Sequence, residues 1–106
     1  MPESTDRGAL TEAVFYILLS LVTPLHGYGI MHRVTELTEG RVNLGPGTLY
    51  GAINTLLDKR WIELVSEGRK KEYLLTELGK VVLDDEIIRL EELIKNGRKI
   101  LEASHE

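Results

Sequence analysis

The spacing of apolar positions is most regular in residues 45–60, where it predicts an amphipathic helix. Apolar side chains recur at intervals of three and four, which places them on one face of a helix: Leu49, Ala52, Ile53, Leu56 and Leu57. Gly45 suits the N-cap and Pro46 the first helical position, because the N–H that proline lacks would have no intrahelical partner there. We therefore predict a helix that begins at Pro46.

The opposite face of this helix is small and hydrogen-bonding. It carries Gly47, Thr48, Tyr50, Gly51, Asn54 and Asp58, and none of the long Lys and Glu side chains of an ordinary solvated face. A partner can approach such a face closely, and the free N–H groups of a first helical turn favour an anion. The pattern indicates a face on which a partner could sit closely.

Two further helices are predicted ahead of it. The first is capped by Thr11 and runs to about Val22, and it is apolar nearly all round, which is typical of a helix buried on several sides. The second opens at His26, continues through Leu37 and should end near Gly40 as its C-terminal glycine. Residues 41–44 are expected to form a short extended connector.

Short β-branched and aromatic runs follow at residues 61–66 and 72–76. They are separated by Glu67-Gly68-Arg69-Lys70-Lys71, which is typical of a hairpin with a glycine turn and a basic tip. Three helices followed by a hairpin predict a winged helix-turn-helix over residues 10–76. The expected fold is mainly α with a small β-hairpin, in a single domain over residues 1–106.

A last helix is predicted from Glu77 to about residue 104, capped by Thr76. Its apolar residues alternate spacings of four and three, as in a helix that pairs with another helix: Leu83, Ile87, Leu90, Ile94, Gly97 and Leu101. Only about two and a half heptads are present, too few for a free coiled coil. We expect this C-terminal dimerisation helix to pack on the first helix through Phe15, in the same or a second subunit.

Charge is distributed unevenly along the chain, whose formal net charge is -4. Residues 41–76 hold six basic and four acidic side chains, whereas the segments before and after them each carry a net charge of -3. Because the electrostatic footprint of a DNA-binding protein is local, a basic middle between acidic ends permits contact with DNA.

Several kinds of chemistry have no sequence support. The chain has no cysteine, which excludes disulfides and thiolate sites and is compatible with the cytoplasm. There is no His-Glu-x-x-His motif, and the glycines from Gly45 to Gly51 do not match the dinucleotide fingerprint, so we expect neither a metal nor a cofactor, and no enzyme. The longest apolar run, residues 13–22, is too short to span a bilayer.

Five fragments in order and spacing resemble the PadR-like family of transcriptional regulators: Leu25-His26-Gly27-Tyr28-Gly29-Ile30, Gly47-Thr48-Leu49-Tyr50, Leu56-Leu57, Trp61-Ile62-Glu63 and Arg69-Lys70-Lys71-Glu72-Tyr73-Leu74-Leu75-Thr76-Glu77-Leu78-Gly79. The resemblance covers roughly residues 10–80, and a single C-terminal helix is similar to the short subclass of the family. It implies a repressor that acts as a homodimer joined through the first and last helices. Such a dimer would hold two recognition helices about 34 Å apart on a pseudo-palindromic site.

One position departs from the family pattern. The helix that begins at Pro46 corresponds to the recognition helix of the family. Where the family usually has a glycine between this helix and the first strand of the hairpin, this chain has Lys59-Arg60-Trp61. Two geometries are open: an arginine in a left-handed C-cap, at a cost of about 1 kcal/mol, or a different turn.

The DNA-binding residues are predicted from the helix at Pro46. Its first two turns should enter the major groove, where Thr48, Tyr50 and Asn54 reach phosphates or base edges. The Asn54 amide can pair with adenine through two hydrogen bonds. Tyr50 also has a structural alternative, since it lies at the edge of the apolar stripe and can simply pack there.

The predicted phosphate contacts lie outside that helix. Arg69, Lys70 and Lys71 form the hairpin tip, where cations meet the DNA backbone, although a solvated turn would look the same. The hydroxyl of Tyr28, at the start of the second helix, can touch another phosphate. His26 and His32 are interpreted as capping or surface residues.

A second class of function stays open, namely a small-molecule sensor or protein-interaction module on the same fold with weak or no DNA binding. A small apolar or aromatic effector could lie where Leu90 and Ile94 meet Phe15 or Tyr16, although a plain dimer core explains those residues equally. The predicted dimerisation residues are Phe15, Leu83, Ile87, Leu90, Ile94 and Leu101.

Overall fold

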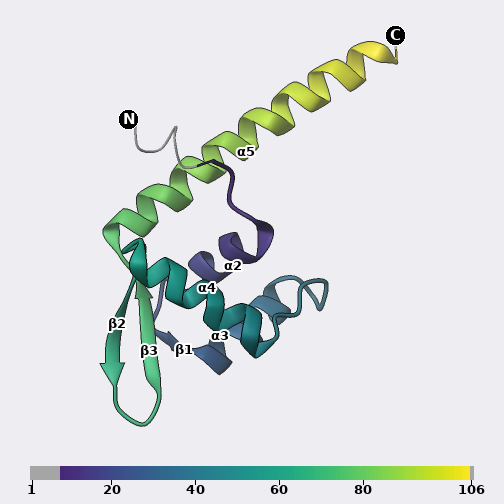
Figure 1. Cartoon of the computed structure of the whole chain (residues 1–106). Helices are drawn as coiled ribbons and strands as arrows, with labels where there is room; N and C mark the ends of the chain where they lie inside the picture. Colours follow the sequence, from purple (N-terminus) through teal and green to yellow (C-terminus); the bar gives the residue numbers. More distant parts are fainter. Residues whose placement is uncertain (1–7, 106) are drawn as a thin grey trace.

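Three short helices, a hairpin and one long helix follow one another in the computed structural model, which describes residues 8–105 (Figure 1). The elements, labelled as in Figure 1, are α2 Glu12–Ser20, β1 Leu25–His26, α3 Gly27–Leu37, α4 Pro46–Asp58, β2 Ile62–Glu67, β3 Lys71–Leu75 and α5 Glu77–Ser104. This is a mainly helical winged helix-turn-helix with a long C-terminal helix, as predicted.

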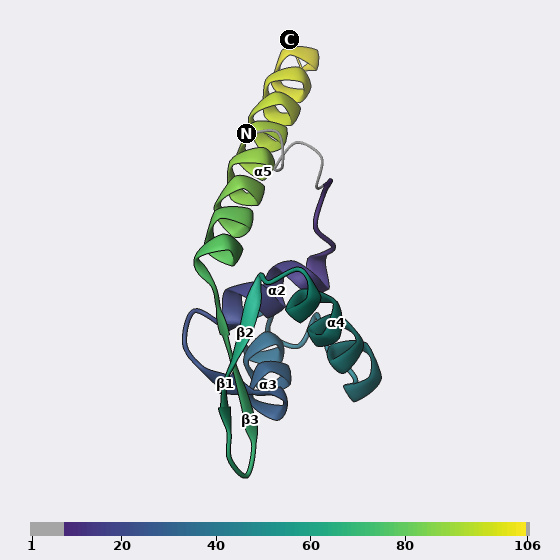
Figure 2. The ribbon, with the colours of Figure 1, turned by 60° about the vertical axis from the view of Figure 1, so that its left-hand side comes forward.

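The sheet has three strands, one more than the predicted hairpin. Strand β3 lies in the middle, with the order β1-β3-β2, and both of its neighbours run antiparallel to it. The extra strand β1 pairs Leu25 with Tyr73 and His26 with Glu72. A strand of two residues is too short to show an alternation of apolar and polar positions, so it was not predicted from the sequence. Its pairing brings the start of α3 beside the wing, the hairpin of β2 and β3 (Figure 2).

The predicted helix starts are confirmed by their capping contacts. The Thr11 hydroxyl accepts the N–H of Val14 at 3.2 Å, and Gly45 caps α4 with Pro46 in its first turn. His26 caps α3, since its Nδ1 accepts the N–H of Gly29 at 3.1 Å. These local contacts fix where the helices begin.

The helix ends differ from prediction by one to three residues. Helix α2 stops at Ser20, two residues before the expected Val22. At the end of α3 the left-handed position is taken by Glu39 (φ 52°), and the N–H of Gly40 (φ 84°) donates to the Thr35 carbonyl at 2.9 Å. Gly40 therefore lies one residue after the left-handed capping position, which Glu39 occupies. The hydrogen bond from Gly40 to Thr35 spans six residues and closes the last turn of the helix.

The connector before α4 is tied to its neighbours by side-chain hydrogen bonds and forms no strand. The Thr38 hydroxyl accepts the N–H of Val42 at 3.0 Å, and the Thr35 hydroxyl donates to the Asn43 side chain at 3.1 Å. Arg41 pairs with Glu12 on α2, and this hydrogen bond lowers the pKa of the Glu12 carboxyl. The loop thus holds the entry to α4.

The core lies where α2, α3 and α4 meet the inner side of the sheet. On α4 the predicted apolar stripe is confirmed, with Leu49, Ile53 and Leu56 buried and Ala52 and Leu57 packed against them. The remaining buried apolar residues come from α2 with its C-cap, α3, β2, β3 and α5: Ile17, Leu18, Leu21, Ile30, Val34, Ile62, Tyr73, Leu75, Val82 and Leu83.

Helix α5 packs on the body only through its first turns and then projects away from it, opposite to the wing (Figure 1). Every described residue from Glu91 to the end of the helix is exposed. Over residues 8–105, no helix is both long and apolar enough to cross a membrane.

The end of α4, the base of the wing and the start of α5 meet in one junction. The N–H of Trp61 donates to the Leu56 carbonyl at 3.1 Å and that of Arg60 to the Leu57 carbonyl at 3.0 Å, which is a Schellman cap with Arg60 in the left-handed position (φ 64°). Of the two geometries open from the sequence, the structure has the left-handed arginine.

Thr76 fastens this cap to α5. Its hydroxyl donates to the Arg60 carbonyl at 2.7 Å and accepts the N–H of Gly79 at 3.0 Å, and its own N–H donates to the Trp61 carbonyl at 3.0 Å. A Cβ on Gly79 would lie 2.1 Å from the Trp61 carbonyl oxygen, so only glycine fits there.

We expect Arg60→Gly to raise the free energy of unfolding by about 1 kcal/mol, because glycine adopts a left-handed conformation without a Cβ clash. Urea unfolding measures the change. The neighbouring Lys59→Gly is the matched control: Lys59 has φ -78°, so glycine there should destabilise the protein. A lower stability of Arg60→Gly would contradict the strain assigned to Arg60.

Candidate nucleic-acid interface

A groove of about 370 Å³ lies between the start of α3, the exposed side of α4 and the wing. Five of the seven residues predicted to bind DNA line it, together with three that were not predicted. The lining residues are His26, Gly27, Tyr28, Tyr50, Arg69, Lys70, Lys71 and Tyr73. The tertiary fold therefore brings together side chains from three segments of the chain that are far apart in the sequence.

The basic side of the groove is the tip of the wing. Residues 68–70 connect the two strands, and Arg69, Lys70 and Lys71 are all exposed. Within residues 8–105, none of these three cations forms an ion pair with an acidic side chain, although Lys71 lies opposite Glu67 in the sheet register. Their charge is therefore directed at solvent and at any anion that enters the groove.

The start of α3 forms a second side. The Tyr28 ring is 67% exposed and stacks on His26, with ring centroids 6.4 Å apart. Because His26 caps the helix, its structural interpretation is confirmed. The N–H groups of this first turn lie at the positive end of the helix dipole, which adds to the attraction for anions.

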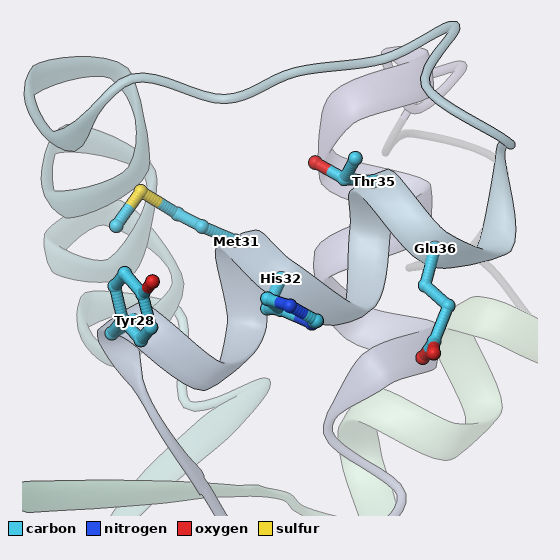
Figure 3. Close-up of a pocket in the computed structure, with 5 residues that line it drawn as sticks. All are labelled: Tyr28, Met31, His32, Thr35 and Glu36. Carbon is cyan, nitrogen blue, oxygen red and sulfur yellow. The ribbon is translucent and has the colours of Figure 1, made fainter.

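The outer side of α3 carries a shallow depression of about 410 Å³, which Figure 3 shows along a single helix. Its lining consists of Tyr28, Met31, His32, Thr35 and Glu36. Only Tyr28 is shared with the groove, and His32 is an exposed surface residue, as expected.

Tyr50 links α4 to α3. A Cβ on Gly27 would lie 2.2 Å from the Tyr50 hydroxyl oxygen, so the ring lies directly over the Gly27 backbone. The side chain is nevertheless 45% exposed and lines the groove. Packing and ligand contact, which were alternatives from the sequence, are thus compatible at this residue.

The exposed side of α4 is as small and polar as its sequence predicts. Thr48 and Asn54 are exposed and lie outside the groove lining. A Cβ on Gly47 or Gly51 would meet no described atom within 4 Å, yet glycine inside a helix costs about 0.5–1 kcal/mol relative to alanine. Packing within the described chain does not account for these two glycines.

Tyr73 is the residue of the groove that sequence reasoning missed. It lies on the central strand β3, is only 6% exposed and belongs to the core. Burial raises the pKa of its phenol, and the neighbouring Tyr50 adds to the shift. Its alternation with Leu75 indicates an inward side chain, but only the position of β1 and α4 shows that it reaches the groove.

Comparison with known proteins identifies the family. The profile of the transcriptional regulator PadR-like family matches residues 15–85, which cover most of α2, the helix-turn-helix, the wing and the start of α5. The chain belongs to this family. The resemblance found in the sequence is confirmed, and the family is one of transcriptional regulators, not of enzymes.

Individual relatives agree with this assignment. The transcriptional regulator YqjI of Escherichia coli is 32% identical over 74 residues, which are 66% of this chain and 36% of YqjI. An uncharacterized 37.1 kDa protein in a transposon of Streptomyces fradiae is 36% identical over 77 residues, 71% of this chain and 22% of that protein. The chain thus spans well under half the length of these relatives.

The fold is shared with a solved crystal structure over nearly the whole length of that structure's chain. The PadR family transcription regulator from Clostridium difficile has a TM-score of 0.74 at 24% identity, over 86% of this chain and 99% of that one. At this identity the likeness shows the fold, including the three-stranded sheet that contains the wing and the long C-terminal helix.

A second depression, of about 330 Å³, separates α2 from α5 in this PadR-like chain. Its lining includes Phe15, Tyr16 and Leu90. Below them, Glu86 is 1% exposed and pairs with Arg89 at 2.6 Å, a hydrogen bond that raises the pKa of Arg89. The Glu86 carboxylate also accepts the N–H of Leu10 at 3.1 Å, so this buried charge is satisfied.

The predicted dimerisation residues fall into three groups by their exposure. Leu83 is 6% exposed inside the core of its own chain and offers almost no surface to a partner. Phe15 and Leu90 are half-buried at the second depression, whereas Ile87, Ile94 and Leu101 are exposed. Heptad spacing does not distinguish a residue buried in the core of its own chain from one available to a partner subunit.

No group of three His, Cys, Asp or Glu side chains in the described chain could hold a metal ion.

Proposed function

We propose that this PadR-like protein is a sequence-specific DNA-binding repressor that acts as a homodimer on a pseudo-palindromic operator. The observation that carries the proposal is the groove, which gathers three cations and a helix N-terminus beside the small, uncharged residues exposed on the first part of α4, Gly47, Thr48, Gly51 and Asn54. A dimer bound to an operator blocks access to it, which is why we propose repression.

Helix α4 is the proposed reader of sequence. The major groove admits an α-helix, and an exposed face of Gly47, Thr48, Gly51 and Asn54 lets the helix backbone come close to the base edges. The two glycines, which packing in the described chain does not explain, then have a reason: a methyl group at either position would face the DNA.

We expect Asn54→Ala to reduce the preference for the operator over a scrambled duplex by about 1–3 kcal/mol, because the amide pairs with adenine through two hydrogen bonds. The operator comes from selection on a random DNA pool, and fluorescence anisotropy gives both affinities. Asp58→Ala, four residues later on the exposed side of the same helix, is the control and should leave the ratio unchanged. An unchanged affinity ratio for Asn54→Ala would exclude this residue as a base reader.

Neutralising the wing should weaken binding to every duplex alike. In the variant Arg69→Ala/Lys70→Ala/Lys71→Ala, we expect the slope of log affinity against log salt to fall by about 0.9 for each phosphate that the wing no longer neutralises. Anisotropy titrations at several salt concentrations give the slope.

The matched control removes three cations from the far part of α5, in the variant Lys95→Ala/Arg98→Ala/Lys99→Ala. It has the same net charge as the wing variant, so its slope should remain close to that of the unchanged protein. Equal slopes for both variants would mean that overall charge, not the wing, attracts DNA. If the unchanged protein binds no duplex at ~50 mM salt, the sensor or protein-interaction function takes the place of DNA binding.

The dimer is proposed from the exposed part of α5. Ile87, Ile94 and Leu101 lie on one side of the helix and are 37%, 57% and 64% exposed. An isolated helical segment of about 14 residues is marginal in water unless another helix packs on it. A second subunit would bury this side and the half-buried Phe15 and Leu90.

We expect Ile94→Asp to convert the dimer to a monomer in sedimentation experiments, because a carboxylate would be buried in the subunit contact. Asn96→Asp, an exposed position off the apolar side of the helix, is the control and should remain dimeric. A dimeric Ile94→Asp, or a monomeric unchanged protein, would contradict a contact through α5.

Ligand response is part of the same proposal, through the depression between α2 and α5. Its volume of about 330 Å³ and its lining of Phe15, Tyr16 and Leu90 suit a small apolar or aromatic effector.

A further inference from the structure

The Tyr73 side chain lines the groove and has no hydrogen-bond partner in the described part of the chain. The residue is only 6% exposed, and no hydrogen bond joins its side chain to residues 8–105. A buried polar group that forms no hydrogen bond destabilises the fold, so the large majority of such groups are paired. Phenylalanine would fill the same space in this sheet without that cost.

The Tyr73 phenol lies near that of Tyr50 in the lining of the groove. Tyr73 is a lining residue, and the phenol of Tyr50, which lies over Gly27, is close enough to contribute to the raised pKa of Tyr73. The groove lining therefore combines two phenols, the first turn of α3, and the cations Arg69, Lys70 and Lys71. All of these groups donate hydrogen bonds or carry positive charge.

A groove lined by hydrogen-bond donors, cations and a helix N-terminus matches the chemistry of a phosphodiester. The anion accepts hydrogen bonds from phenol O–H and backbone N–H groups, and the cations compensate its charge. A phenol keeps its proton at neutral pH and therefore remains a donor. A base edge, by contrast, would leave the cations without a counter-charge.

We propose that this groove is a phosphate site for the DNA backbone, and that the Tyr73 hydroxyl donates a hydrogen bond to a phosphodiester oxygen held there. The inference rests on the proposed function and adds a binding residue on the central strand of the sheet. Tyr73 contributes affinity and fixes how deeply the backbone lies between the wing and α3, and it reads no base.

The test is Tyr73→Phe, which removes one oxygen atom and leaves the ring. We expect roughly three- to tenfold weaker binding, equal for the operator and for a scrambled duplex, with an unchanged salt slope because a neutral donor releases no counterion. We also expect a melting temperature equal to or above that of the unchanged protein, because Tyr73→Phe removes no hydrogen bond within the described chain. Affinity within twofold of the unchanged protein would overturn the proposal.

Two comparisons separate the hydroxyl from other causes. A structural role of Tyr73 would lower the melting temperature together with the affinity, and that outcome overturns the phosphate site. Lys70→Ala should have a different effect from Tyr73→Phe, because the loss of a cation should reduce the slope of log affinity against log salt by about 0.9. If the unchanged protein binds no DNA, the proposed function itself fails; if it binds and Tyr73→Phe binds equally well, only the phosphate site fails.

Modified DNA locates the contact. In operator duplexes that each carry one uncharged methylphosphonate linkage, we expect one position at which the unchanged protein loses affinity and Tyr73→Phe loses at least twofold less. The same loss in both proteins at every position would overturn the assignment. Inorganic phosphate at ~10 mM tests for a free anion: if it raises the melting temperature of the unchanged protein only, while Tyr73→Phe binds DNA normally, the ligand is free phosphate and not DNA.

Discussion

The junction around Thr76 is the constraint on which the remaining geometry depends. Its hydroxyl joins the last turn of α4 to the first turn of α5, and its N–H holds the base of the wing through the Trp61 carbonyl. The neighbouring N–H of Leu75 donates to the Leu21 carbonyl at 2.8 Å, so the end of α2 is attached at the same place. The proposed recognition helix, the wing and the proposed dimerisation helix are therefore joined to one another at this junction.

Close packing, in addition to hydrogen bonding, fixes the geometry of this junction. The start of α5 can approach Trp61 only because Gly79 has no Cβ, and α4 can turn directly into β2 only because Arg60 accepts a left-handed conformation. In a dimer built through α5, the direction of that helix would set the separation of the two copies of α4. A strained cap at this position thus has a geometric role that an ordinary turn would not fulfil.

Local charge explains how a protein with a net charge of -4 can offer a surface to DNA. The acidic residues lie mainly in the first 40 residues and along α5, whereas the wing tip is free of ion pairs within the described chain. At physiological salt, charges farther apart than about 8 Å are largely screened from each other. An anion in the groove therefore interacts mainly with Arg69, Lys70 and Lys71 and little with the acidic far part of α5.

The sequence by itself determined the elements whose signals lie within one or two helical turns. Thr11 and Thr76 mark helix starts through hydrogen bonds to N–H groups three residues away, and Gly45-Pro46 does so through the preference of glycine for the N-cap and of proline for the first turn. The apolar spacing of α4 predicts which residues it buries. The family was also recognisable, because its fragments follow one another in a fixed order.

Only the tertiary structure decided the features that depend on contacts between distant segments. Strand β1 exists because β3, 46 positions later, offers a partner for Leu25 and His26. Leu83 shares its spacing with Ile87 and Ile94, yet it is buried because the core of its own chain reaches that far along α5. Tyr73 reaches the groove, and Arg60 is held in a left-handed turn, through neighbours that no local pattern identifies. The physical reason is that capping and periodicity act within a turn, whereas these positions depend on which distant segments pack together.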